Sequence, residues 1–171
     1  SWLALGYVQL LQRQGPAAKQ SLQNAYDLII ANNLPRELAI YHEYFGELCL
    51  IEGNSKLAEE QYLKALEIGE KIAPEGDIIN QVSRLLAELK LATGHHSSAA
   101  KYASRSLEVS LQLVDKLEEG AAYRILARVY DHNSESSRAK KQLSLALKVF
   151  QKSRNDYELA KTYLQAGKLK C

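Results

Sequence analysis

Histidines and carboxylates are the side chains through which this sequence could do chemistry. His95 and His96 are adjacent, and neighbouring side chains on a turn do not converge on one metal ion. No cysteine and no third histidine lies near them in the sequence. The pair therefore favours a solvated turn, and we expect no metal site.

No arrangement of residues indicates catalysis. The carboxylate pairs Glu59-Glu60 and Glu118-Glu119 lie in helical patterns and are typical of solvated helix faces. The sequence contains no Gly-rich phosphate loop, no nucleophile elbow and no Cys-His arrangement. We expect no catalytic residue, no cofactor and no enzymatic activity.

The composition is that of an ordinary globular domain, with 46% hydrophobic and 25% charged residues in 171. Nine Gly and three Pro are few, which favours helices over strands. A net charge of +2 gives no bulk attraction to nucleic acid, and no apolar run approaches the ~20 residues of a membrane span. We expect a cytoplasmic protein with no direct nucleic-acid partner and no membrane partner. Cys49 and Cys171 are expected to be reduced thiols.

The chain is expected to be a fragment of a longer protein, because it has no Met and opens in the middle of a helical pattern. Small residues recur along it with a period of 40 or 41 residues, at Gly6, Gly46, Ala87, Ala127 and Gly167. Each of the first four anchors is followed by a second set of residues at offsets of 12, 16 and 19. Small anchors and the residues that pack beside them form a packing signature: Gly6, Ala18, Gly46, Ala58, Tyr62, Ala65, Ala87, Ala99, Ala127, Ala139 and Ala146.

This periodicity predicts helical hairpins, because two antiparallel helices approach closely only where their side chains are small. Gly46 and Ala58 would make the contact within one hairpin, Tyr62 would fill the space beside it, and Ala65 would let the next hairpin stack. One hairpin cannot bury its apolar face alone, so neighbours stack into a continuous core. We expect one domain over 1–171, with repeats at about 1–33, 34–75, 76–115 and 116–154 and a final helix at 155–171.

The signature resembles the tetratricopeptide repeat, with its Leu-Gly pair, two alanines and a large residue between them. Leu5, Gly6, Ala18, Leu22 and Ala25 match one copy of that pattern. The usual period of the family is about 34, so the longer period implies its long-helix branch. The resemblance implies an all-α, right-handed superhelical array of antiparallel helix hairpins, an α-solenoid. The repeat sequence is also similar in character to the repeat regions of large bacterial multidomain regulators, and this resemblance implies a role in signalling or transcription regulation.

The resemblance also implies a concave groove lined by the first helix of each repeat. By this resemblance eight residues would line the groove, and their character changes along the chain from apolar and acidic to basic. They are Glu43, Glu47, Leu50, Arg84, Glu88, Arg124, Arg128 and Lys161. Two interpretations of the cations remain open, as solvated charges or as a patch for an acidic peptide. Chaperone-binding members hold a terminal carboxylate with a Lys-Asn-Asn-Lys-Arg clamp. Glu43, Glu47, Glu88 and Ala121 occupy the corresponding positions, so no such clamp is expected.

The resulting functional hypothesis is a protein- or peptide-interaction module, regulatory or scaffolding, within a larger protein. One alternative is a sensor that binds a small signal peptide or metabolite in the groove. Another is an architectural spacer that self-associates through exposed end helices. The apolar residues expected at those ends are Trp2, Leu3, Leu159, Tyr163 and Leu164.

Overall fold

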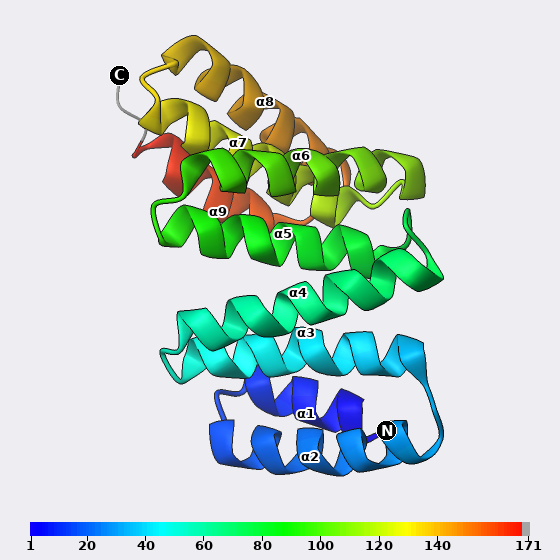
Figure 1. Cartoon of the computed structure of the whole chain (residues 1–171). Helices are drawn as coiled ribbons and strands as arrows, with labels where there is room; N and C mark the ends of the chain where they lie inside the picture. Colours follow the sequence, from blue (N-terminus) through cyan, green and yellow to red (C-terminus); the bar gives the residue numbers. More distant parts are fainter. Residues whose placement is uncertain (169–171) are drawn as a thin grey trace. The chain divides into compact units, whose positions relative to one another are not determined.

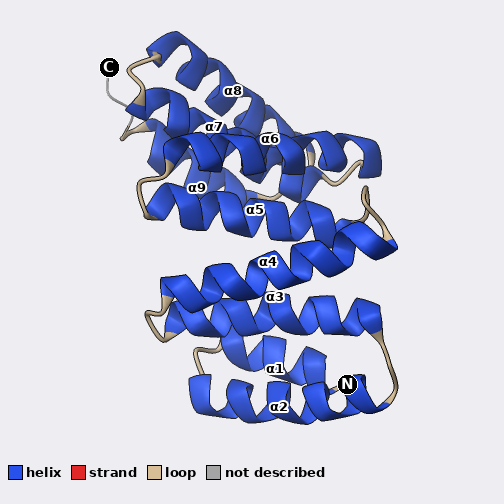
Figure 2. Cartoon of the chain, in the orientation of Figure 1, coloured by secondary structure: helices blue, strands red, loops and turns tan. Residues whose placement is uncertain are grey.

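The computed structural model describes residues 1–168, and within them every regular element is an α-helix (Figures 1 and 2). Cys171 lies outside the described residues. In chain order the helices of this part are α1 (Trp2–Leu11), α2 (Gly15–Ala31), α3 (Pro35–Ile51), α4 (Ser55–Ile72), α5 (Asp77–Ala92), α6 (His96–Leu113), α7 (Lys116–His132), α8 (Ser136–Lys152) and α9 (Asp156–Ala166). The predicted all-α array of helical hairpins is confirmed.

The helix ends follow from local sequence. The side chains of Asn54, Asp115 and Asn155 accept hydrogen bonds from backbone N–H groups in the first turns of α4, α7 and α9, which otherwise lack partners. Pro35 begins α3, where its missing N–H costs nothing. Gly53 and Gly94 end two hairpin turns at φ +79°, a left-handed conformation that glycine adopts without strain.

The chain divides into two compact units, residues 1–82 (unit 1) and 83–171 (unit 2), and the boundary falls inside α5. In unit 1, α1 packs on α2, α2 on α3 and α3 on α4. A core forms between them from Leu10, Ala18, Leu22, Ala25, Ile29, Tyr41 and Leu48. A Cβ added to Gly46 would lie 2.5 Å from the Tyr62 ring, so the close approach of α3 and α4 requires glycine there.

Unit 2 repeats this arrangement, with α6 packed on α7, α7 on α8 and α8 on α9. Its core contains Ala87, Leu91, Ala99, Ala103, Ile125, Leu126 and Val129. Gly120 lies against the fully buried Phe150 ring, which a Cβ would overlap. This contact was not expected from the sequence, because Gly120 lies outside the small-residue signature.

All eleven residues of the packing signature are buried. Ala58, Ala99 and Ala139 each have no exposed surface on the second helix of a hairpin. Tyr62 is also fully buried. The small residues therefore lie where neighbouring helices come closest.

Candidate binding groove

A pocket of about 750 Å³ opens in unit 2 between the first helices of its hairpins. The C-terminal part of α5, the start of α6, α7 and α9 supply its walls: Glu88, Leu91, His96, Arg124, Ile125, Arg128, Asp131, His132, Lys161, Leu164, Gln165 and Lys168. The pocket thus brings together four of the eight residues expected in the groove, namely Glu88, Arg124, Arg128 and Lys161.

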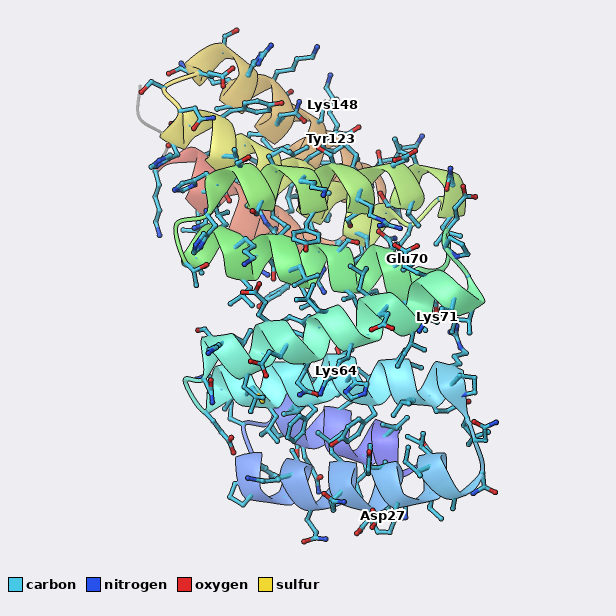
Figure 3. All side chains as sticks on the ribbon, in the orientation of Figure 1. Asp27, Lys64, Glu70, Lys71, Tyr123 and Lys148 are labelled. Carbon is cyan, nitrogen blue, oxygen red and sulfur yellow. The ribbon has the colours of Figure 1, made fainter. Side chains whose placement is uncertain are left out.

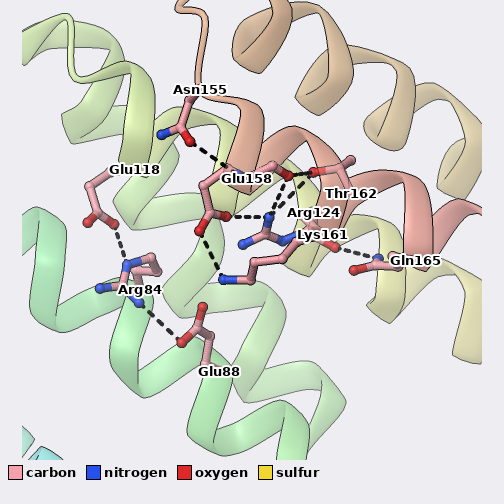
Figure 4. A network of polar contacts seen from close by, with 9 residues as sticks. All are labelled: Arg84, Glu88, Glu118, Arg124, Asn155, Glu158, Lys161, Thr162 and Gln165. Atoms are coloured by element: carbon pink, nitrogen blue, oxygen red, sulfur yellow. Dashed lines mark hydrogen bonds and ion pairs between the residues drawn. The ribbon is translucent and has the colours of Figure 1, made fainter. Parts of the chain in front are cut away.

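Arg124 was expected as an exposed cation, but the structure buries it between α7 and α9. Its guanidinium lies 2.5 Å from the carboxylate of Glu158, which is also buried (Figure 4). It also donates to the backbone carbonyl of Glu158 and the hydroxyl of Thr162, each at 3.4 Å. The amide of Gln165 donates to the Arg124 carbonyl at 3.0 Å. Arg124 therefore holds α9 against α7.

Arg84 makes the equivalent contact one repeat earlier. Its Nε donates to the buried carboxylate of Glu118 at 2.6 Å, and its Nη1 donates to Glu88 at 3.1 Å (Figure 4). Arg84 and Arg124 are 40 residues apart, and so are Glu118 and Glu158. The two ion pairs are one motif repeated along successive first helices. This periodicity was present in the sequence and could have identified Glu118 and Glu158 as partners of the arginines.

The two buried carboxylates differ in pKa. Burial raises the pKa of Glu118 to about 7, although the charge of Arg84 opposes it. Burial also tends to raise the pKa of Glu158, but hydrogen bonds from Lys161 and Arg124 outweigh it and hold that pKa below its usual value. Lys161 donates to Glu158 at 2.9 Å, and its ammonium lies 5.0 Å from the centre of the Tyr157 ring. Lys161 is therefore engaged within α9.

Arg128 differs from the other three cations of the prediction. Its side chain is exposed on α7 and makes no hydrogen bond or ion pair within residues 1–168. Beside it, the imidazoles of His96 and His132 stack at 3.5 Å between ring centres, with 12° between their planes. From the sequence, His96 was expected in a solvated turn, and its contact with His132 was not expected.

The three predicted groove residues of unit 1 lie on α3. Glu43 is buried, Glu47 is half-buried, and Leu50 is 37% exposed. On the same helix, Tyr44 stacks on Tyr7 of α1 at 4.7 Å between ring centres. The acidic stretch of the expected groove is thus largely packed into unit 1.

His42, Cys49 and the His95-His96 turn were the other residues with possible chemistry. His42 is half-buried, its Nδ1 lies 2.8 Å from Gln61, and burial lowers its pKa. Cys49 is buried, and burial raises the pKa of its thiol, which makes it a poor nucleophile. Within residues 1–168, no group of three His, Cys, Asp or Glu side chains could hold a metal ion. None of the helices in this range is both long and apolar enough to span a membrane.

The fold is similar to that of the Signal Transduction ATPase with Numerous Domains (STAND) protein with a tetratricopeptide repeat sensor from Pyrococcus horikoshii. The TM-score is 0.78, with 19% sequence identity over 94% of this chain. BtubC (BKLC) from P. vanneervenii is also similar, with a TM-score of 0.71 and 24% identity over 93% of this chain. The chain spans 25% of the first protein and 65% of the second. No protein-family model and no curated protein matches the sequence. At these identities the likeness shows the fold, an all-α, solenoid-like repeat array.

Proposed function

We propose that this chain is a tetratricopeptide-type interaction segment of a larger regulatory protein, and that the pocket of unit 2 holds a peptide segment of a partner. The observation that carries this proposal is the pocket's mixed lining. Leu91 and Ile125 give it an apolar floor, while Arg128 offers a cation that makes no hydrogen bond or ion pair within residues 1–168. A concave surface with a few oriented polar groups on an apolar floor is typical of binding sites.

The solved structures are consistent with a regulatory role. One of them, by its description, is a signal transduction ATPase whose tetratricopeptide repeats act as a sensor. A sensor for a small acidic signal molecule is the second candidate, because the pocket volume of about 750 Å³ falls in the range of small-molecule sites. Both candidates use the same pocket and differ in the length of the occupant.

Peptide selection tests the proposal. Peptides would be selected from a random display library on the whole chain, and their affinities measured for the parent and two pocket variants, Arg128→Glu and Leu164→Ser. Leu164 lines the pocket and is 68% exposed, so its replacement spares the core. Lys148→Glu is the matched control, because Lys148 is exposed on α8 and does not line the pocket (Figure 3).

We expect the selected peptides to lose about tenfold or more in affinity for the pocket variants and to bind the control like the parent. Equal affinity for all four proteins would place the binding surface elsewhere and contradict the proposal. Failure to select any peptide, with a small acidic molecule raising the melting temperature, would favour the sensor.

A further inference from the structure

Three positive or titratable groups follow one another along one face of α7. Arg124, Arg128 and His132 are spaced by four residues, and all three line the pocket. Like charges at this spacing repel and destabilise a helix. Glu158 compensates Arg124, whereas Arg128 has no such partner within residues 1–168. The row is therefore locally unfavourable for the unoccupied chain and favourable for an anion.

The His96–His132 stack fixes the end of this row. The Nδ1 of His96 is buried and accepts or donates no hydrogen bond within the described part of the chain. Burial lowers the pKa of His96, and the positive charges of His132, Arg128 and His95 lower it further. His132 is exposed and is the last residue of α7, where the helix dipole favours a cation.

We propose that Arg128 and His132 bind a carboxylate of an acidic peptide segment, and that the stacked ring of His96 positions the His132 imidazole. This proposal rests on the proposed function and names the chemistry of the occupant. The guanidinium offers two parallel N–H donors and the imidazole a third, and charge-assisted bonds from Arg128 to a carboxylate are stronger than neutral ones. Leu91, Ile125 and Leu164 lie in the same pocket, so the carboxylate would belong to a chain with apolar neighbours.

The other ionisable groups near His132 come from every neighbouring element. They are Glu88 on α5, His96 on α6 with His95 before it, Arg128 and Asp131 on α7, Lys161 on α9 and Lys168 after it. Glu88 accepts from Arg84, and Lys161 donates to Glu158. The pocket lining contains four Lys or Arg side chains and two acidic ones, which suits an acidic occupant.

The test uses a matched pair of peptides with the whole chain. Acetyl-Leu-Glu-Glu-Leu-amide is the acidic probe, and acetyl-Leu-Gln-Gln-Leu-amide has nearly the same shape without charge. Affinity is measured by NMR titration of the chain with each peptide at low ionic strength and one fixed pH, with the His96 and His132 ring signals and the Leu and Ile methyl signals as reporters. We expect the acidic probe to bind at least about tenfold more tightly and to shift the His132 ring signals.

Four variants and one control separate the roles. Arg128→Gln and His132→Gln should each lose affinity for the acidic probe, Arg128→Gln by about tenfold. His96→Phe keeps a flat stacking partner and should retain the affinity, whereas His96→Ala should weaken it. The control, Lys148→Gln on α8, should change nothing.

Four outcomes would overturn the carboxylate site. One is equal binding of the acidic and amide peptides. The second is an unchanged affinity in His132→Gln. The third is a loss in Lys148→Gln as large as in Arg128→Gln, which would indicate unspecific attraction of anions. The fourth is methyl shifts of Leu91 and Ile125 without any response at Arg128 or His132, which would leave the peptide-binding function intact.

Discussion

Two carboxylates in equivalent positions show how strongly single residues depend on their surroundings. Glu118 and Glu158 are both buried and each faces an arginine, yet the pKa of Glu118 is raised to about 7 while that of Glu158 is lowered. The difference lies first in burial, because Glu118 is the more deeply buried of the two and also faces the carboxylates of Asp115 and Glu88. It lies second in another cation, because Lys161 also donates to Glu158. A carboxylate with a raised pKa makes stability depend on pH near neutrality.

Glu118 should therefore destabilise the fold as the pH rises. Its pKa is higher in the folded chain than in the unfolded chain, so the folded state holds the extra proton between about pH 4.5 and pH 7. The free energy of unfolding should fall across this window by about 2 kcal/mol relative to Glu118→Gln. Urea denaturation of both proteins at several pH values measures this difference in the free energy of unfolding. His42 and His96 contribute a pH dependence of opposite sign, and it cancels because both proteins contain them. A difference that does not change with pH would mean that Arg84 keeps Glu118 ionised throughout.

A second residue-scale prediction concerns the contact between α3 and α4. Ala58 has no exposed surface, so Ala58→Leu should overpack that contact and lower the free energy of unfolding by roughly 1–3 kcal/mol. Lys64→Leu adds a leucine at an exposed position of the same helix and should change stability by less than about 0.5 kcal/mol (Figure 3). Chemical denaturation compares them, and equal stability of Ala58→Leu and the parent would contradict the assigned contact.

At the scale of helices, local sequence was sufficient to predict most of the architecture. The repeat of small residues located the hairpins, because helices can approach closely only at such positions, as the Gly46–Tyr62 contact shows. The groove was predicted less well. The cations expected to line it lie on α5, α7 and α9, and whether each one is free depends on carboxylates about 34 residues away, such as Glu118 for Arg84 and Glu158 for Arg124. The helix pattern does not reveal that pairing, although the 40-residue period of both partners does.

The same contacts make α9 dependent on one side chain of α7. Arg124→Ala would leave the buried carboxylate of Glu158 without its arginine and would remove the bonds to Thr162 and the Glu158 carbonyl. Breaking a buried ion pair from one side costs roughly 3 kcal/mol or more. We expect faster amide hydrogen exchange throughout α9, with α7 and α8 less affected.

The double variant Arg124→Met, Glu158→Met is the control for this prediction. Replacing both partners with apolar side chains leaves no buried charge and should cost less than Arg124→Ala alone. Unchanged exchange in α9 after Arg124→Ala would show that its apolar contacts with α8 are enough to hold it.

At the scale of the whole chain, apolar side chains are exposed on α1 and on α9. At the N-terminal end, Trp2, Leu5 and Val8 follow one face of α1 and are 44%, 42% and 47% exposed. Leu3, which was expected in this patch, instead packs against the core of unit 1. In α9, Tyr163 and Leu164 are exposed as expected, whereas Leu159 is half-buried. Residues 2, 5 and 8 are spaced by three and lie on the outer face of α1, whereas Leu3 lies on the face that packs against the core of unit 1.

An exposed apolar face of this kind favours association of the chain with a second copy. We expect sedimentation velocity to show a concentration-dependent rise in the average mass of the parent chain. Leu5→Glu with Val8→Lys should abolish the rise without loss of helicity, because both side chains are exposed and their removal spares the core. Lys148→Glu and Lys152→Glu on α8 change charge at exposed positions away from α1 and should leave association unchanged. A parent chain that remains monomeric at high concentration, or that associates equally after the α1 changes, would exclude this face as a self-association surface.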